Sequence, residues 1–451
     1  MTHGIEYLSG TAACTALAEG TLTSVQYVAA LLDRIQRLEH LHAFISVAPE
    51  QALRAAKQAD KRRAVGGHLP PMLGLPFAVK DLIDVRGIPT TAHSRILATP
   101  ASATAATVTR LRRDGGIYLG KLALEEFGIG SPMDALPWPS PSNPWEGSRT
   151  AGGSSSGSAV ALAAGLVPFA LGTDTGGSVR APAAYCGLTA LKPTNSRIDM
   201  RGVIPLAPSL DTVGPMARSA ADCALLLSSM LHSTSRPVFR NSTIGVIDTA
   251  AAGLPIDSAV HRAMCEALTT FSSLGCLVTP SRPPDFDLAR QVGGTILSYE
   301  AHAVHRQRLA THADWYGKTC RARLEAGASI SRDVYLDALA HREQLRARLD
   351  VLFETVDLLA LPVVFAAAAS LDDAAGMSRN GNVTFRLIFN VTGHPALVLC
   401  TGFDAAGLPL SMQLVGRHGE DERLLQLAMA YQRVTSWHDA HPPTREGTTR
   451  E

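Results

Sequence analysis

The chain has 451 residues, of which 46% are hydrophobic and 5% aromatic, and it carries a formal net charge of +1. That length suffices for one large α/β unit or for two or three smaller domains. The balanced charge lacks the basic runs of a nucleic-acid-binding protein, and the scarcity of aromatic residues argues against a base-stacking surface.

The first 64 residues are predicted to form a helical prefix. An amphipathic helix capped by Ser24 is expected over 24–38, because apolar residues recur there at helical spacing. These residues are Val28, Leu31, Leu32, Ile35 and Leu38. A second helix is expected over about 49–63, and Gly66-Gly67 follows its end.

Apolar runs then alternate with helical stretches over the rest of the chain. Buried strands are predicted at 75–79, 117–119, 168–171, 188–191, 243–247, 358–361, 396–399 and 412–415. Helices are predicted at 107–113 and 159–164, and an exposed, arginine-rich helical pair is predicted around 300–355. This alternation predicts an α/β fold with a large, mostly buried sheet. Without repeats or long linkers, a single domain over 1–451 is expected.

Lys80 ends the first of these apolar runs and is therefore expected to be partly buried at a strand end. Burial lowers a lysine pKa by up to about 3–5 units, which would leave Lys80 neutral near pH 7 and able to accept a proton. Asp81 would point to the opposite face, because side chains alternate along a strand. The alternative is a surface lysine paired with Asp81 or Asp84.

A glycine-serine loop at 152–159 reads Gly-Gly-Ser-Ser-Ser-Gly-Ser-Ala and matches the Gly-x-Ser-x-Gly nucleophile elbow at Ser155. That elbow needs a strand immediately before it, but residues 146–151 read as a loop. A phosphate-binding loop is also disfavoured, because no lysine follows the glycines. A loop that caps the helix over 159–164 is the simpler interpretation.

A second glycine-serine loop at 172–180 reads Gly-Thr-Asp-Thr-Gly-Gly-Ser-Val-Arg. Its glycines permit conformations in which consecutive N–H groups turn inward as an anion site, and Ser178 follows them directly. A tetrahedral oxyanion needs such donors, and here they would come from Thr175, Gly176, Gly177 and Ser178. A tight turn that caps a helix beginning near Ser178 also explains these residues.

Together these elements resemble the amidase signature family. The resembling stretches are GLPFAVKD at 74–81, GGSSSGSAVALAAGLVPFALGTDTGGSVRAPAAYCGLTALKP at 152–193, PLAPSLD at 205–211, VGPM at 213–216, FNVTGHPA at 389–396 and QLVG at 413–416. The resemblance covers nearly the whole chain. It implies an amidase of α/β fold, with a large mixed sheet flanked by helices on both faces.

The resemblance also implies roles for individual residues. Ser178 would be the nucleophile that forms an acyl-enzyme, Ser154 would relay protons after a cis peptide bond, and Lys80 would be the base. Thr175, Gly176 and Gly177 match the oxyanion loop, Asp174 and Arg180 match structural positions, and Ser131 matches a position that binds substrate. Residues 65–220 would form the catalytic core and 221–451 the substrate pocket, with no cofactor or metal.

The chain departs from the family pattern at two places, of which the first is a tolerated variation and the second bears on function. Ser156 replaces a commoner glycine, and residues 134–139 read Asp-Ala-Leu-Pro-Trp-Pro where glutamyl-tRNA amidotransferase A subunits carry Thr-Glu-Asn. The second departure favours a stand-alone amidase acting on a small-molecule amide. An apolar pocket for uncharged amides is predicted from Met133, Leu136, Trp138, Phe385, Ile388 and Phe389, although ordinary core packing also explains them. Arg379 would instead suit a carboxylated amide.

Three other functions stay open. They are the A subunit of a tRNA-dependent amidotransferase, an α/β-hydrolase-like esterase that uses Ser155 with a late histidine, and a non-catalytic binding protein of the same fold. Possible metal ligands at Glu300, His302 and His305, and at His438 and His441, lack a third ligand with convincing spacing.

Cysteine usage and the N-terminus bear on the compartment. The seven cysteines include no Cys-x-x-Cys pair, and the first 30 residues lack a signal-peptide pattern. No apolar run is long enough to span a membrane. We therefore expect a cytoplasmic enzyme with no nucleic-acid or membrane partner, and with a homodimer as one open assembly.

Overall fold

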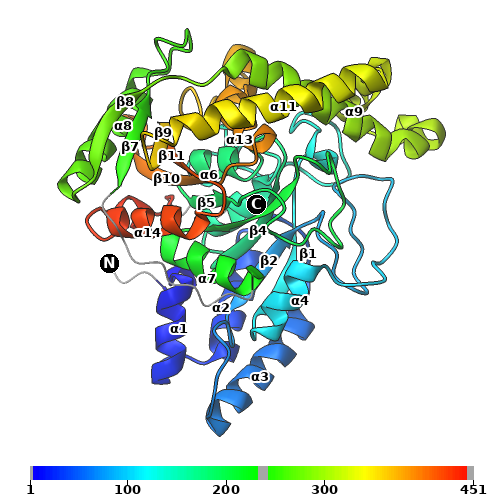
Figure 1. The fold of residues 1–451 in the computed structure, drawn as a ribbon. Coiled ribbons are helices and arrows are strands. Elements are labelled where there is room, and N and C mark those ends of the chain that lie inside the picture. The colour runs from blue at the N-terminus through cyan, green and yellow to red at the C-terminus, as the bar shows by residue number, and fades with distance from the viewer. Residues whose placement is uncertain (1–3, 232–241, 444–451) are drawn as a thin grey trace.

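The structure is a computed structural model that describes residues 4–231 and 242–443. The eleven strands of the described residues form one mixed sheet through the middle of the molecule, in the order β1-β3-β2-β4-β6-β5-β10-β11-β9-β7-β8 (Figure 1). The strands are β1 Phe44–Val47, β2 Pro76–Lys80, β3 Ile117–Leu122, β4 Phe169–Asp174, β5 Thr189–Lys192, β6 Thr212–Ala217, β7 Thr243–Ile247, β8 Leu277–Ser281, β9 Leu358–Pro362, β10 Ala396–Phe403 and β11 Pro409–Gly416. The predicted α/β fold with a large mixed sheet is confirmed.

Strand direction decides which loops meet. β2 lies between β3 and β4 and runs parallel to both, and β7 runs parallel to β8 and β9, whereas the other neighbouring pairs are antiparallel. Because β2 and β4 are parallel, with Val79 opposite Leu171, their carboxyl ends lie at the same edge of the sheet. This arrangement brings Lys80, at the end of β2, beside the loop that follows β4.

Helices cover both faces of the sheet (Figure 1). They are α1 Gly10–Glu19, α2 Ser24–Arg37, α3 Pro49–Val65, α4 Ala106–Arg113, α5 Ser156–Ala163, α6 Arg180–Cys186, α7 Ala220–Leu231, α8 Ser258–Ser273, α9 Phe286–His312, α10 Lys318–Ala326, α11 Arg332–Leu352, α12 Ala374–Gly381, α13 Thr384–Val391 and α14 Asp421–Gln432. Helices α2 to α4 lie at the lower end of the view and α9 and α11 at the upper end.

Two short helices are buried along their whole length. Every residue of α5 and of α6 is buried, and the two helices pack against each other inside the main core. Their small side chains, mostly alanine, glycine and serine, allow close packing under the sheet. The loops that precede α5 and α6 are the two glycine-serine loops, so the core holds both loops from behind.

Three features differ from the sequence-based expectation. Helix α2 is capped by Thr23 and not by Ser24, because Thr23 and Gln26 form a reciprocal capping box. Strands β1, β6 and β8 were not predicted: β6 contains Gly214 and Pro215, and β1 and β8 are short, partly exposed edge strands. The arginine-rich region contains α9, α10 and α11 where a pair was predicted, and α9 has a buried face.

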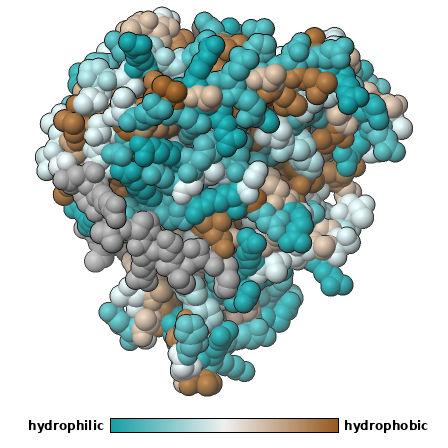
Figure 2. Space-filling view, in the orientation of Figure 1, coloured by the Kyte–Doolittle hydropathy of each residue, from teal (hydrophilic) through white to brown (hydrophobic). Residues whose placement is uncertain are grey.

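The face of the molecule drawn in the space-filling view is mainly polar where its residues are described. On the face shown in Figure 2, hydrophobic residues form small patches separated by hydrophilic ones. None of the helices in the described ranges combines the length and the apolar character that a membrane span requires.

Candidate active site

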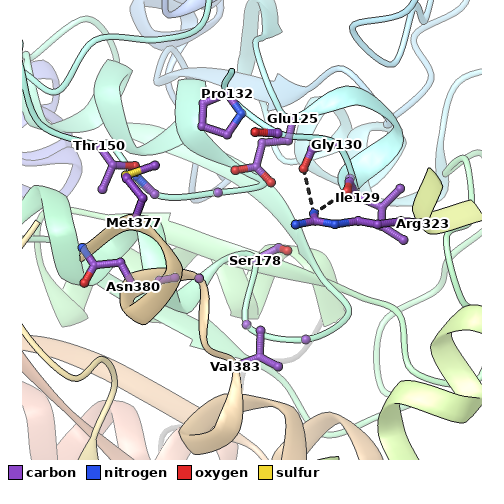
Figure 3. Close-up of a pocket in the computed structure, with 18 of the residues that line it drawn as sticks. Glu125, Ile129, Gly130, Pro132, Thr150, Ser178, Arg323, Met377, Asn380 and Val383 are labelled. Atoms are coloured by element: carbon purple, nitrogen blue, oxygen red, sulfur yellow. Dashed lines mark hydrogen bonds between the residues drawn. The ribbon is translucent and has the colours of Figure 1, made fainter. Parts of the chain in front are cut away.

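A cavity of about 590 Å³ contains the predicted catalytic loops. Its walls come from the segment after β3, from both glycine-serine loops, from α10 through Arg323, and from residues 371–386 around α12 (Figure 3). Segments that lie more than 200 residues apart in the sequence therefore meet in one pocket. Ser178 lies on the wall of this cavity, and its hydroxyl has no hydrogen-bond partner within the described part of the chain.

Lys80 is fully buried at the end of β2. Its Nζ atom donates to Ser154 Oγ at 2.7 Å and to Thr173 Oγ1 at 2.8 Å, so its close partners are hydroxyl groups. Burial lowers the pKa of Lys80 to about 7. The more distant carboxylates of Glu125, Asp174 and Asp211 act in the opposite direction and raise this pKa, but their effect is smaller. Lys80 is thus able to lose its proton near neutral pH, and its pairing with Asp81 or Asp84 is excluded as the main contact.

Asp81 lies on the other side of the strand, as the alternation of side chains predicts. Its carboxylate is 3.1 Å from Lys121 Nζ and accepts hydrogen bonds from the backbone and the hydroxyl of Thr91. Both charged groups are buried. Lys121 therefore neutralises Asp81 and keeps that charge away from Lys80.

Ser154 and Ser155 are adjacent but have different surroundings. The Gly153–Ser154 peptide bond is cis, as the family resemblance implies, and Ser154 Oγ faces Lys80. Ser155 is buried, and its hydroxyl donates to the Thr173 carbonyl and accepts from the Thr173 N–H. The Ser155 hydroxyl thus fastens the first loop to β4, and it is not exposed at a nucleophile elbow.

Asp174 organises the second loop. It accepts hydrogen bonds from the N–H groups of Gly177 at 2.8 Å and Val179 at 3.1 Å, and it forms a buried ion pair with Arg180 at 3.0 Å. Burial alone would raise the pKa of Asp174, but Arg180 and further donors hold it well below its usual range. Among the expected oxyanion donors, the Gly177 N–H is therefore already used by Asp174.

The other expected donors remain available. Within the described residues, no hydrogen bond engages the backbone N–H of Thr175, Gly176 or Ser178. Gly177 has φ +116°, and a Cβ atom there would lie 2.5 Å from Arg386 Nε, so only glycine fits this turn. The loop can thus present three N–H groups at the cavity beside Ser178.

Two residues that the sequence reading did not single out fasten this loop from a distance. Asp211 accepts from Thr175 Oγ1 at 2.6 Å, and Asn390 on α13 donates to Asp174 Oδ1 at 2.8 Å. Burial raises the pKa of Asp211 to about 6. Both residues lie in stretches that resemble the family, but nothing in their local pattern indicates which loop they contact.

Glu125 and Arg323 are the charged groups of the cavity that sequence reasoning missed. The Glu125 carboxyl points into the cavity toward Ser178, and Arg323 reaches in from α10 (Figure 3). Arg323 Nη1 donates to the carbonyls of Ile129 at 2.7 Å and Gly130 at 2.9 Å. Burial raises the pKa of Glu125 to about 7, although the charges of Arg323 and Lys80 oppose this shift. Neither residue belongs to a recognisable motif.

The predicted substrate pocket is only partly correct. Ser131 and Met133 line the cavity, whereas Leu136, Trp138 and Arg379 are absent from its described lining. Phe385, Ile388 and Phe389 are almost fully buried in a hydrophobic cluster behind the cavity, because α13 packs against α9. Ordinary core packing thus accounts for that set.

Two of the histidines considered as metal ligands, His302 and His305, each place a ring nitrogen against another group of the protein. The Nε2 atom of His438 lies 3.5 Å from the Asp439 carboxylate. His305 Nδ1 lies 2.9 Å from the Tyr316 hydroxyl, His302 Nδ1 lies 3.1 Å from the Leu324 carbonyl, and Glu300 accepts from Tyr335. Among the described residues, the one group whose geometry could hold an ion is Asp350, His394 and His418, outside the cavity.

The chain is similar to known proteins along most of its length. The family model described as Amidase matches residues 26–425. The A subunit of glutamyl-tRNA(Gln) amidotransferase from Chloroflexus aggregans is 37% identical over 485 residues, which cover 97% of this chain and 98% of that protein.

Solved structures with the same fold include enzymes that act on amides. One is described as an amidase, with a TM-score of 0.87, 29% identity and coverage of 94% of this chain and 99% of the other. Another is the peptide amidase of Stenotrophomonas maltophilia, with a TM-score of 0.83, 27% identity and coverage of 98% and 99%.

Proposed function

The chain belongs to the amidase family and is an amide-cleaving enzyme, and from this premise we propose that it hydrolyses a small carboxylic amide through an acyl-enzyme on Ser178. The products would be a carboxylic acid and ammonia or an amine. Lys80, Ser154 and Ser178 would carry the chemistry, and no residue of the mechanism requires a metal. The chain would form a single domain. Its substrate pocket would be built by residues of the catalytic core together with residues of the C-terminal half.

In this mechanism neutral Lys80 accepts the proton of Ser154 while Ser154 accepts that of Ser178, and Ser178 Oγ attacks the carbonyl carbon. The resulting oxyanion accepts hydrogen bonds from the N–H groups of Thr175, Gly176 and Ser178. Ser154 then protonates the nitrogen and takes back the proton held by Lys80, the C–N bond breaks, and the amine leaves. Water repeats the attack on the ester of Ser178 and releases the acid.

The observation that carries this proposal is the 2.7 Å contact between Lys80 and Ser154 beneath a cavity that exposes Ser178. A lysine held by hydroxyl groups in a buried site is a base, whereas a lysine in an ion pair is not. Among the described residues, the Ser178 hydroxyl and the N–H groups of Thr175, Gly176 and Ser178 have no hydrogen-bond partner, so they would supply the nucleophile and the oxyanion site.

Replacement of Ser178 by alanine tests this assignment. Ser178→Ala is expected to lower kcat/KM by about 10⁴-fold or more while the protein stays folded, because the acyl acceptor is lost. In the wild type, a fluorophosphonate should add once, at Ser178, as measured by intact mass and peptide mapping. An adduct at Ser155 would overturn the assignment.

A second candidate is the A subunit of a tRNA-dependent amidotransferase. The identity of 37% to such a protein over 97% of the chain favours it. The departure at residues 134–139 counts against it, and Asp134 there accepts from the Thr319 N–H, so this segment is used to hold α10.

Assay of the purified chain alone separates the two candidates. A stand-alone amidase is expected to turn over simple aliphatic or arylalkyl amides without partner chains. Activity confined to glutamine, and only after partner chains are added, would establish the amidotransferase role instead.

A further inference from the structure

Glu125 places its carboxyl group in the active-site cavity. Within the described ranges, no donor hydrogen-bonds its carboxyl group, and no cation lies within ion-pair distance of it. Arg323 shares the cavity, but its Nη1 is held by two backbone carbonyls. The Glu125 side chain is half-buried and lines the cavity, so its oxygens are accessible to a ligand that brings N–H groups, and such a ligand would supply the donors that the carboxyl group lacks.

The position of Glu125 places this acceptor beside Ser154. The Glu125 N–H donates to the Ser154 carbonyl at 3.1 Å, and a Cβ atom on Gly153 would fall 2.1 Å from Glu125 Oε1. The carboxyl group therefore rests on the Gly153 backbone, next to the residue that contacts Lys80. Figure 3 shows it directed toward Ser178 across the cavity.

Building on the proposed function, in which Ser154 protonates the leaving nitrogen, we propose that Glu125 is the amine subsite of the enzyme. Its carboxylate accepts hydrogen bonds from the N–H groups of the scissile amide and then from the departing ammonia or amine. The substrate class is thus an amide with at least one N–H on the scissile nitrogen.

The chemistry of the leaving group explains why this acceptor matters. As Ser154 donates its proton to the nitrogen lone pair, the N–H groups become more acidic, and a carboxylate stabilises them by charge-assisted hydrogen bonds. An ester has no N–H at this position and cannot use Glu125. The raised pKa of Glu125, about 7, also leaves a useful fraction of carboxylate at neutral pH.

A trapping experiment tests the subsite separately from acylation. A p-nitrophenyl ester and the primary amide of the same acid give the same acyl-enzyme, which either water or hydroxylamine can attack. With hydroxylamine, the new C–N bond replaces the bond to Ser178 Oγ, and the proton from nitrogen passes through Ser154 to that oxygen. The ratio of hydroxamic acid to carboxylic acid therefore measures binding of an amine nucleophile at the subsite.

Glu125→Gln is expected to keep ester hydrolysis within about threefold of wild type and to lower kcat/KM for the amide by about 10- to 100-fold. The ratio of hydroxamic to carboxylic acid should fall by a similar factor, because the introduced carboxamide is a weaker acceptor that also offers competing N–H groups. Retained ester turnover shows that the variant is folded.

Asp372→Asn is the matched control, because Asp372 is an exposed carboxylate next to the cavity residue Leu371 and is itself absent from the described cavity lining. It should leave the trapping ratio unchanged. An unchanged ratio in Glu125→Gln, or equal losses on ester and amide, would overturn the subsite. Failure of the wild type to form an acyl-enzyme at Ser178 would instead overturn the proposed function.

Discussion

Lys80 and Lys121 are two fully buried lysines on the neighbouring strands β2 and β3, but they face opposite sides of the sheet. Lys121 lies opposite Val79 in the parallel register, so it shares a face with Asp81 and forms an ion pair with it. Lys80 points to the other face, where Ser154 and Thr173 offer hydroxyl groups.

The comparison shows that burial alone does not define a catalytic lysine. Burial favours the neutral form of both lysines and lowers the pKa of both, but at Lys121 the direct contact with Asp81 opposes that shift. Alternation along β2 separates the neighbours Lys80 and Asp81, and Lys121 neutralises Asp81 on the far face. One face of the strand pair is thus built for proton transfer and the other for holding the loops together.

Lys80→Met should have the largest effect on this comparison. The substitution keeps the volume of the side chain but removes the base, so kcat/KM is expected to fall by about 10⁴-fold, at the upper end for a proton-transfer group. Steady-state kinetics on a simple amide measure the loss. The free energy of unfolding, from urea titration, should change by less than about 1.5 kcal/mol.

An activity loss below tenfold in Lys80→Met would contradict the base role. The same result would remove the contrast between the two faces, because Lys80 would then be a structural lysine as well.

Lys121→Met is the counterpart on the opposite face. It leaves Asp81 buried without its cation, which is expected to cost about 3–5 kcal/mol of unfolding free energy. In urea titration the midpoint should fall, while the pH dependence of kcat/KM in the folded protein stays that of wild type. Asp81→Asn added to Lys121→Met should recover part of the stability. If Lys121→Met shifted the pH profile of kcat/KM and left the unfolding free energy unchanged, Lys121 would take part in proton transfer, and the roles given to the two faces would be reversed.

Much of this contrast could be predicted from the sequence. The apolar run before Lys80 predicts its burial, alternation predicts that Asp81 faces away, and the glycines before Ser178 predict an anion-binding turn. These inferences need only local rules of strands and turns. The strand predicted at 243–247 has the same bounds in the structure, whereas those predicted at 117–119, 168–171, 396–399 and 412–415 are longer by a few residues that include polar residues and glycine.

The partners of these residues could not be predicted, because the strand order sets them. Lys121 meets Asp81 only because β3 lies beside β2, and Asn390 meets Asp174 across 216 residues of sequence. Glu125 enters the cavity because β3 ends at the same edge as β2. No periodic pattern or motif marks such contacts, and the predicted pocket was partly wrong for the same reason.

Ser154→Ala sharpens the proton-transfer side of the comparison. Amine expulsion requires protonation of the nitrogen, whereas an activated ester expels a good leaving group without it. The variant is therefore expected to lose about 100-fold or more on an amide and several-fold less on the matching p-nitrophenyl ester. Ser155→Ala is the neighbouring control and should mainly lower stability, because the partner of the Ser155 hydroxyl in the described part of the chain is the Thr173 backbone. Equal losses on ester and amide would make Ser154 a structural residue.

Thr173→Val should give the smallest effect, and it tests whether hydroxyl partners set the behaviour of Lys80. In the wild type, kcat/KM is expected to rise with pH through an apparent pKa near 7, because Lys80 must lose its proton to act as a base. Thr173 Oγ1 accepts a hydrogen bond from Nζ, which favours the charged ammonium more than the neutral amine. Its removal should therefore lower the pKa of Lys80 and move the rising limb to lower pH by less than about one unit. Glu125 loses its proton in the same range and its charge raises the pKa of Lys80, so the Thr173→Val profile is best compared with its parent in the Glu125→Gln background, where the titration of Glu125 no longer contributes. A shift of the rising part of the pH profile to higher pH would contradict this expectation. It would mean that the Thr173 hydroxyl stabilises the neutral amine of Lys80 more than the charged ammonium.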